Sequence, residues 1–514
     1  MNKLKATRLP VIYFILLTSL ASIVYHYYEW NLINKYPNGA FYINNGVTYG
    51  NGDNDYYFSP VENYLSGKGW RNNPPVGNGS YFRRTPGYSL VYLFARVITP
   101  TIKSSLYVLV VINCILYLVA FWSLSKILIY LRTSNIIYNL GMLFIAVIPY
   151  LYHILLCTLT ESISVYLVII SIYFIIKAYN EQAPKKKILS YVFASFFLGY
   201  DTLTRPYLGM LLLLLPVFGF IEYYKFGIKK LLFNYIIIGC IPVFIIGCWT
   251  IRNYRLTSEI VFLEKAYHPE SLDRMKPEFR GFWNFVKCWG EDGVVFNNYQ
   301  LPLYANALKG DTSYRYVQDV IKHVPDDVVK IVGEQNITTL LSRYQQVVYS
   351  QKEYFDKQIA MPVHYTNEQI NLENDFNALS HQYIKQNKIK YYIICPAKYL
   401  KQIIFHSNTV GIYFLQEQFR KYTILNLLRY LSAGIHISLF FFIFLSIYTT
   451  RKKTPYFIIF VVVPILYLLF FSYIVQTIEQ RYFSPILPLL LLGAIYNINF
   501  FYERYIAKNT LSRP

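Results

Sequence analysis

Two carboxylates in a polar turn, Asp53 and Asp55, are the first side chains in this sequence whose type and spacing suggest chemistry. The stretch around them reads YGNGDNDYYFSPVENYLSGKGW from residue 49 and, after a gap rich in Pro, Asn and Gly, RRTPGY. A carboxylate in such a turn can accept the proton of a hydroxyl group and so act as a general base. The structural alternative is that these residues cap a helix, because Asp and Asn are favoured at that position.

The segment after the turn predicts a helix of roughly ten residues. Four residues at helical spacing would share one of its faces: Tyr57, Val61, Tyr64 and Leu65. Asp55 lies where it would cap this helix, whereas Asp53 lies in the preceding Gly-Asn turn. Asp53 is therefore the favoured candidate for the base, and Asp55 is the second candidate.

The composition is that of a membrane protein. More than half of the 514 residues are hydrophobic and only 15% are charged, which excludes an ordinary soluble domain. The formal net charge is +21, but Lys and Arg cluster in short runs between apolar spans, so they indicate topology and not nucleic-acid binding. The six cysteines contain no C-x-x-C pair; a disulfide between Cys288 and Cys395 in the predicted outer segment is left open.

Repeated apolar runs predict an all-α bundle of about ten transmembrane helices. The first span follows MNKLKATR and is taken as retained, with its N-terminus in the cytoplasm. Gly87 to Thr99 is too short to span and is expected to lie at the outer interface. The later spans are predicted at 104–131, 136–157, 162–178, 187–204, 207–224, 231–251, 423–449, 455–476 and 481–502.

Three regions follow from this pattern: 1–252, a transmembrane catalytic module with an outer loop at 28–103; 253–422, a mostly helical extracytoplasmic domain; and 423–514, the last transmembrane helices. Alternating the spans places the basic clusters on one side, as the positive-inside rule requires. These clusters are at 3–8, 132, 185–187, 225–230, 451–453 and 504–508. The agreement predicts cytoplasmic termini and a site that faces outward from a bacterial inner (plasma) membrane.

The same threading gathers polar residues at the outer ends of the spans. They come from five connections: Asp53, Asp55, Arg83 and Arg84; then Glu161; then Arg205; then Arg252 and Asn253; then Arg481 and Tyr482. A single charged residue at a span end is explained by snorkelling into the lipid headgroups. Charged residues at five separate connections, on the side that the rule leaves poor in arginine, favour a functional site.

These residue types suit the transfer of a sugar from a polyprenyl-phosphate donor. Such a reaction needs a general base for the acceptor hydroxyl and cations for the charge that develops on the leaving phosphate. Guanidinium forks match phosphate geometry and stay charged at any accessible pH. A base on one face of the sugar and a stabilised leaving group on the other is the inverting arrangement. The expected phosphate ligands are Arg205, Arg252 and Arg481, with Arg83 or Arg84 as weaker candidates.

The motifs, in this order, resemble those of the GT-C glycosyltransferases, most closely the branch of the protein mannosyltransferases and the aminoarabinose transferase of lipid A. Asp53-x-x-x-Tyr57-x-x-x-Val61 with G-x-G is similar to the family's first-loop pattern, although Val61 stands where a small residue is usual. Later motifs are similar at Thr160-Glu161, Thr204-Arg205-Pro206, Trp249-x-x-Arg252-Asn253 and Arg481-Tyr482-x-x-Pro485. The resemblance implies a GT-C-type bundle with Asp53 as the catalytic base and Glu161 as the second acidic residue. Substrate contacts are expected from Tyr57, Asn253 and Tyr482.

The predicted function is therefore a mannosyltransferase-like membrane enzyme that moves a sugar from a polyprenyl-phosphate donor to a lipid, glycan or protein acceptor in the cell envelope. No cofactor is required; a divalent cation is compatible with the chemistry, although no His/Asp/Glu cluster has ligand spacing. One alternative is an O-antigen-type polymerase or ligase, which would not need the acidic first loop. A transporter is a further alternative, but transporters place ionisable residues at mid-bilayer and commonly contain an internal repeat, which this sequence lacks.

Overall fold

The computed structural model describes residues 7–36, 41–72, 84–224, 227–258, 260–264, 276–357, 359, 361–362, 364–405, 419, 421–476 and 479–507. Almost all regular structure in these residues is helical, and six of their helices are long and apolar enough to cross a membrane. These are Val11–Lys35, Ile102–Tyr130, Glu161–Asn180, Ile228–Leu256, Thr423–Thr450 and Thr454–Val475. The prediction of an all-α polytopic membrane protein is confirmed.

The membrane bundle is built around α6 (Glu161–Asn180). This helix is apolar around its whole circumference, which is typical of a helix enclosed by others. Accordingly, 83% of the most apolar 18-residue stretch of α6 is buried. The corresponding share is 18% for α9 (Ile228–Thr257), which lies at the periphery. Helices α4 (Ile102–Tyr130) and α7 (Pro184–Thr204) pack on α6, and α9 packs on α7. The N-terminus of α6 is thus fixed at one end of the bundle.

The remaining elements of the bundle account for the other predicted spans. They are α1 (Val11–Lys35), α5 (Asn135–Val147), the 3₁₀ helix η1 (Pro206–Leu213), α8 (Leu214–Tyr223), α18 (Thr423–Thr450), the continuous stretch from α19 (Thr454–Phe457) through η6 (Ile458–Val462) and α20 (Val463–Leu469) to η7 (Phe470–Val475), α21 (Leu487–Phe501) and η9 (Tyr502–Ala507). Every predicted span contains helix, but several of the helices are short, so the number of crossings stays a prediction.

Two predicted spans have different limits in the structure. The span predicted at 136–157 is helical only to Val147, because Pro149 disfavours the helical conformation at Ile148, whose φ and ψ are −73° and 132°. The span predicted at 481–502 becomes α-helical only at Leu487, and Arg481 lies before it in a 3₁₀ turn, η8 (Gln480–Phe483). Both differences leave irregular backbone at the end of the bundle where α6 begins.

The outer loop contains a β-hairpin that the sequence analysis did not predict. Strands β1 (Tyr42–Asn44) and β2 (Thr48–Gly50) pair antiparallel around a turn in which Asn45 and Gly46 have φ values of 49° and 68°. Positive φ at two successive turn residues is typical of a type I′ turn, which the Asn-Gly sequence favours. The hairpin delivers the chain directly to the Asp53 turn.

Helices α2 (Asn54–Leu65) and α3 (Gly87–Ile98) complete the described part of the loop and pack on each other. The predicted α2 face is only half right: Tyr57 and Val61 are buried, whereas Tyr64 and Leu65 are exposed. The buried face instead adds Phe58, whose ring stacks on Tyr92 of α3 at a centroid distance of 4.2 Å. Helix α3 is a short apolar helix of 12 residues, as predicted.

The region from residue 276 to 405 is helical, as predicted, and has a hydrophobic core of its own. Its helices are α10 (Pro277–Lys287), α11 (Gly293–Lys309), α12 (Tyr314–Ile321), α13 (Asp326–Val332), α14 (Glu334–Tyr349), α15 (Lys352–Lys357), α16 (Asn367–Gln386), η3 (Lys390–Ile394) and α17 (Cys395–Phe405). Cys288 and Cys395 are both buried free thiols. The predicted boundary at 252 falls inside α9, which continues to Thr257.

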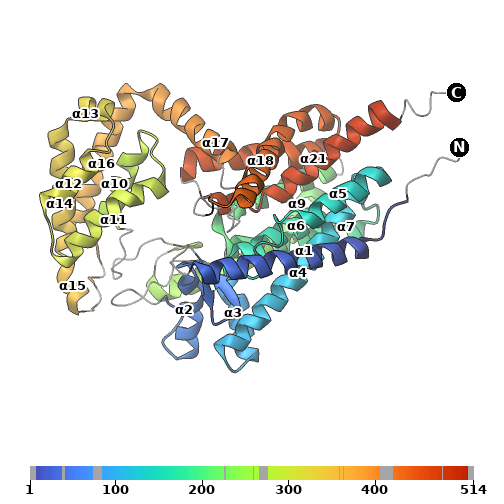
Figure 1. Ribbon diagram of the computed structural model, residues 1–514, viewed down its shortest axis with the longest axis horizontal. Helices are drawn as coiled ribbons and strands as arrows, with labels where there is room; N and C mark the ends of the chain where they lie inside the picture. Colours follow the sequence, from blue (N-terminus) through green and yellow to red (C-terminus); the bar gives the residue numbers. More distant parts are fainter. Residues whose placement is uncertain are drawn as a thin grey trace.

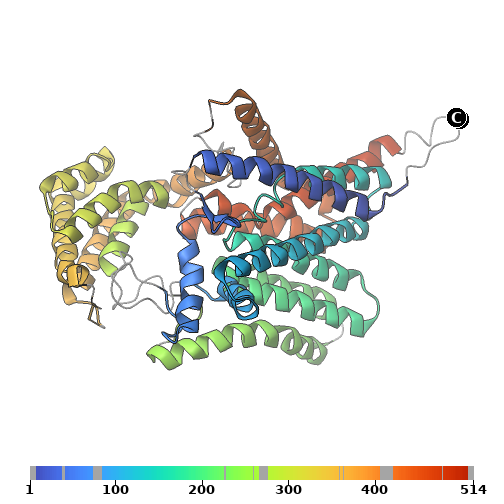
Figure 2. The ribbon, with the colours of Figure 1, turned by 60° about the horizontal axis from the view of Figure 1, so that its bottom comes forward.

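The two parts of the molecule lie at opposite ends of its long axis. Helices α10–α16 form a separate lobe, while α1 begins and α21 ends at the far end of the bundle (Figure 1). A second view shows the same separation, with α9 along one side of the bundle (Figure 2). The N-terminus of α6 and the Asp53 turn therefore belong to the end of the bundle that faces the lobe.

We predict that this lobe is extracytoplasmic and that the opposite end of the bundle is cytoplasmic. The reason is that Arg132 and Lys453, from two predicted inner basic clusters, lie beside Asn180 at the C-terminal end of α6, away from the lobe. Reporter fusions after Lys186 and Lys453 should give cytoplasmic signals, and a fusion after Gly310 should give an extracytoplasmic one. A cytoplasmic signal at Gly310 would contradict both the topology and the outward orientation of the site.

Candidate active site

Main-chain pairing fixes the first loop against the segment that leads into α6. The Tyr49 N–H donates to the Leu156 carbonyl and the Thr158 N–H donates to the Tyr49 carbonyl, both at 3.0 Å. The Tyr49 hydroxyl also donates to the carbonyl of His153. Because β2 leads to Asp53 and residue 158 leads to Glu161, this bridge sets the separation of the two carboxylates.

The structure separates the two aspartates that the sequence offered as bases. Asp53 lies at the N-terminus of α2, and its own N–H donates to the side-chain oxygen of Asn51 at 3.0 Å. Asp55 lies in the first turn of α2 and is exposed to solvent. The helix begins after Asp53, so Asp55 does not occupy the capping position that the sequence analysis gave it.

Arg205 projects from the point where α7 ends. Pro206 disfavours helix at the preceding residue, and Arg205 has extended φ and ψ values of −143° and 104°. The start of α3 touches this point, because a Cβ on Gly87 would lie 2.5 Å from the Thr204 nitrogen. Only glycine permits that approach, and the Tyr200 hydroxyl donates to the Gly87 carbonyl at 2.7 Å. The R-T-P-G and T-R-P motifs therefore meet in space.

Arg481 is the centre of an ion-pair network. Its Nη2 lies 2.6 Å from Asp53 Oδ2, and its Nε lies 3.7 Å from Glu161 Oε1 and also contacts Glu479. Arg205 Nη2 lies 2.8 Å from the same Glu161 oxygen, and Arg84 Nη2 lies 3.7 Å from Asp53 Oδ1. Guanidiniums and carboxylates thus alternate in the order Arg84, Asp53, Arg481, Glu161, Arg205.

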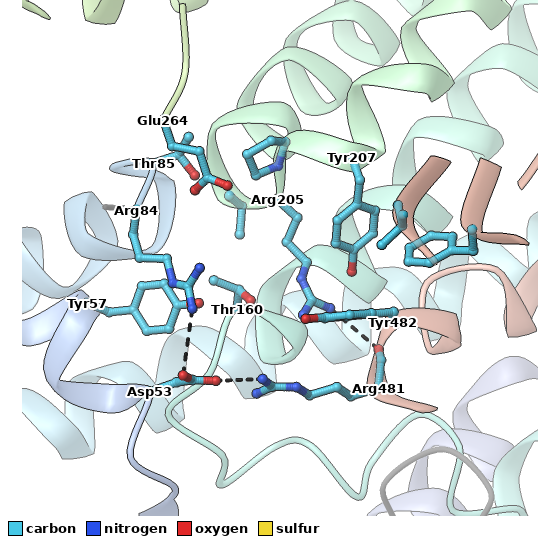
Figure 3. Close-up of a pocket in the computed structure, with 14 residues that line it drawn as sticks. Asp53, Tyr57, Arg84, Thr85, Thr160, Arg205, Tyr207, Glu264, Arg481 and Tyr482 are labelled. Atoms are coloured by element: carbon cyan, nitrogen blue, oxygen red, sulfur yellow. Dashed lines mark hydrogen bonds and ion pairs between the residues drawn. The ribbon is translucent and has the colours of Figure 1, made fainter. Parts of the chain in front are cut away.

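This network borders a cavity of about 170 Å³. The lining residues come from the first loop, the ends of α6 and α7, the segment after α9, and the turn before α21 (Figure 3). They are Asp53, Tyr57, Arg84, Thr85, Thr160, Thr204, Arg205, Pro206, Tyr207, Glu264, Phe471, Val475, Arg481 and Tyr482. The cavity offers one wall of charged groups and one of aromatic rings.

Two tyrosine rings hold Arg205 in place. Its guanidinium carbon lies 5.1 Å from the ring centre of Tyr207 and 5.6 Å from that of Tyr482. These cation–π contacts leave the edge of the guanidinium, where it donates hydrogen bonds, available to anions. Glu161, which is 3% exposed, occupies part of that edge at present and keeps the buried charge paired.

The surroundings of Asp53 favour its ionised form. Burial of the carboxyl raises its pKa, but Arg481 and Arg84 outweigh that effect and hold the pKa of Asp53 below its ordinary value. In the free protein Asp53 is therefore a charged but weakened base. Any partner that draws Arg481 away from Asp53 would strengthen it as a proton acceptor.

Four described residues of the predicted site do not line this cavity. Glu161 only borders it, through its ion pairs with Arg205 and Arg481. Asp55 points to solvent. Arg252 donates to the Trp70 carbonyl at 2.6 Å and to the side-chain oxygen of Asn253 at 2.9 Å, and it stacks on Trp249. Asn253 in turn donates to the Val261 carbonyl at 2.9 Å. The contacts of Arg252 and Asn253 thus join segments of the fold. Arg83 lies outside the described residues.

Thr85, Tyr207 and Glu264 also line the cavity but were not predicted from the sequence. Tyr207 directly follows the motif Thr204-Arg205-Pro206, and Thr85 lies within the R-R-T-P motif. Their closeness to these motifs was therefore a usable signal. Glu264 had no such signal, because it follows an ordinary apolar stretch, VFL, in a region that was predicted to belong to the outer domain.

Among the described residues, no group of three or more His, Cys, Asp or Glu side chains is arranged to hold a metal ion. The carboxylates that line or border the cavity are each close to a guanidinium instead. The arrangement can bind an anion through its arginines and accept a proton through Asp53. Those are the two capacities that transfer from a phosphate-linked donor requires.

Comparison with known proteins gives only a distant structural likeness. No family model and no curated protein matches the sequence. Two solved structures match, both of ArnT from Cupriavidus metallidurans, one bound to undecaprenyl phosphate and one in the apo state. The matches cover 87% and 86% of this chain and 72% of ArnT, with 11% and 10% identity and TM-scores of 0.32 and 0.31. At these values the likeness says nothing about chemistry.

The ion pairs predict how activity depends on pH. Because the pKa of Asp53 lies below its ordinary value of 3.8, the acid limb of kcat/KM in the wild-type protein should lie below that pH. Arg84→Gln removes one of the three arginines that lower this pKa, so the acid limb should move to higher pH. The measurement is the pH profile of kcat/KM, and the position of the limb is the readout.

Arg315→Gln is the matched control, since Arg315 is an exposed arginine of the distant lobe. It should leave the profile unchanged. If the acid limb lies near neutral pH and does not move in Arg84→Gln, the base is a different residue.

Proposed function

We propose that this protein is a membrane glycosyltransferase that moves a sugar from a polyprenyl-phosphate donor to a hydroxyl group of a lipid, glycan or protein acceptor on the outer face of the membrane. The observation that carries the proposal is the position of Asp53, on the cavity wall between Arg84 and Arg481. A candidate base and candidate phosphate ligands thus share one cavity.

In this proposal, Asp53 takes the proton from the acceptor hydroxyl as its oxygen attacks the anomeric carbon. The bond from that carbon to the phosphate oxygen breaks, and the electron pair leaves with the lipid phosphate. Attack from the face opposite the leaving group inverts the anomeric configuration. Arg205 and Arg481 stabilise the phosphate through charge-assisted hydrogen bonds, which are stronger than neutral ones.

Glu161 serves the same reaction by keeping Arg205 in position. The 2.8 Å pair between them is almost fully buried, and a buried guanidinium without a partner would be costly. The tyrosines beside Arg205 restrict it further. Glu161 is thus a positioning residue, and a direct role with a catalytic cation is not needed for this step.

Donor binding would also activate the base. The donor phosphate competes with Asp53 for the Arg481 guanidinium, and loss of that partner raises the pKa of Asp53. Asp53 then becomes a better proton acceptor only when the donor is present. Binding of the first substrate and activation toward the second are therefore linked through one arginine.

Asp53→Asn should leave folding intact and lower the transfer rate by about 10²–10⁴-fold, because the amide is nearly isosteric but cannot accept the proton. The first assay asks whether the variant restores the lipid-linked glycan that is altered when the gene is deleted. The second measures kcat with purified protein. Asp55→Asn, at an exposed position on the same helix, is the control and should retain activity.

The opposite pattern, with a fully active Asp53→Asn and a folded but inactive Asp55→Asn, would reject Asp53 as the base. Unchanged activity in both variants would favour a polymerase or ligase that does not use the acidic loop.

Arg205→Lys and Arg481→Lys should each lower kcat by at least about tenfold, because lysine keeps the charge but cannot form two parallel hydrogen bonds to phosphate. Arg315→Lys is the exposed control. Normal turnover of donor by both variants would remove the phosphate role from these arginines.

A further inference from the structure

The segment after α9 folds back along that helix and is tied to it by three side chains. Trp249 Nε1 donates to the Leu263 carbonyl at 2.7 Å, Thr250 Oγ1 to the Phe262 carbonyl at 3.1 Å, and Asn253 Nδ2 to the Val261 carbonyl at 2.9 Å. Three successive carbonyls thus accept hydrogen bonds from one helix. We call residues 261–264 the return strap.

The return strap delivers Glu264 to the cavity. Its side chain lines the cavity beside Thr85 and Arg84, on the wall across from Asp53 (Figure 3). Glu264 is exposed, whereas the Asp53 side chain is 21% exposed and that of Glu161 only 4%. Glu264 is therefore the carboxyl of the cavity that an incoming ligand reaches most easily.

The charges around the cavity balance before any donor binds. Three guanidiniums, those of Arg84, Arg205 and Arg481, face three carboxyl groups, those of Asp53, Glu161 and Glu264. Glu479 also contacts Arg481, but it does not line the cavity and its side chain is 31% exposed, so solvent screens its charge. A sugar phosphodiester brings one more negative charge into the enclosed space, where an unmatched charge is costly. One proton on a carboxyl group would restore the balance.

We propose that Glu264 is the group that takes up this proton, and that the protonated carboxyl donates a hydrogen bond to the phosphate or sugar of the bound donor. Asp53 must stay unprotonated to accept the proton of the acceptor hydroxyl, and Glu161 keeps its direct contact with Arg205, so neither carboxyl is a suitable carrier. This inference rests on the proposed polyprenyl-phosphate donor.

The environment of Glu264 agrees with this role. Although Glu264 as a residue is exposed, the protein atoms around its carboxyl displace much of the water there. This desolvation raises the pKa of Glu264, and the opposing effects of Arg84 and the Thr85 N–H do not cancel the rise. The carboxyl is thus already closer to protonation than an ordinary glutamate, and a phosphate anion nearby would raise its pKa again.

The titratable and charged groups that share the cavity with Glu264, in the described part of the chain, come from each wall. They are Arg84 before α3, Asp53 and Tyr57 at α2, Arg205 and Tyr207 at the end of α7, and Arg481 and Tyr482 in η8. The tyrosines stay neutral in the range of interest, and the arginines stay charged. Glu264 is therefore the group expected to change protonation on donor binding.

Binding of undecaprenyl phosphate to the purified full-length protein, measured as Kd from pH 5 to 8, tests the proposal. The probe's own titration cancels in the ratio of wild-type Kd to Glu264→Gln Kd at each pH. If Glu264 must be protonated, this ratio should rise with pH, by up to about tenfold per unit above the pKa of the free protein. Glu264→Ala should lose the pH dependence too, but bind more weakly than Glu264→Gln, because it cannot donate a hydrogen bond.

A flat ratio across this range would overturn the proposal. Calorimetry in two buffers of different ionisation enthalpy gives an independent readout, the number of protons taken up on binding. This number should be smaller by about one for Glu264→Gln than for the wild-type protein. Glu334→Gln, an exposed glutamate of the distant lobe, is the control and should match the wild type. If the wild type does not bind undecaprenyl phosphate at all, the proposed function itself fails, whereas normal binding with a flat ratio rejects only the role of Glu264.

Discussion

The Arg481 guanidinium is the contact on which the candidate site depends. It reaches Asp53, 428 residues away in the sequence, and also approaches Glu161 at the start of α6. Arg84 also approaches Asp53 and Arg205 pairs with Glu161, but Arg481 is the guanidinium that contacts both carboxylates. Removing Arg481 would leave two negative groups facing each other in a poorly hydrated space, where like charges repel strongly. The same residue therefore stabilises the assembled site and, in the proposed reaction, receives the leaving phosphate.

The backbone around this contact shows why the motifs lie where they do. The bridge between Tyr49 and the 156–158 segment ties the Asp53 turn to the entry of α6. Gly87 lets α3 touch the end of α7, at the point where Pro206 forces Arg205 out of the helix. Each arrangement uses a residue with a special backbone property at a helix end. Irregular backbone of this kind is tolerated at membrane depth only where it is enclosed by protein or lines a cavity.

The sequence predicted much of this because span ends are readable from hydrophobicity and charge. Arg205, Arg481, Tyr482, Asp53 and Arg84 all line one cavity, as their shared depth suggested. Depth alone does not give direction, however, and Arg252 and Asn253 face other parts of the fold. The hairpin before Asp53 and the return strap were not predicted, because both are defined by hydrogen bonds between segments. Glu264 could not be found from sequence for the same reason: its place depends on Trp249, Thr250 and Asn253 holding three carbonyls.

The paired state of the free protein has a consequence for side reactions. While Asp53 is held by Arg481 and Arg84, its pKa stays low and it is a poor base for any nucleophile, water included. In the proposed reaction it gains basicity only as the donor phosphate takes over Arg481. By then the sugar and lipid phosphate occupy the cavity that Asp53 lines and displace water from it. The donor would thus both activate the base and exclude water from it. This combination would favour transfer of the sugar to the acceptor over hydrolysis of the donor.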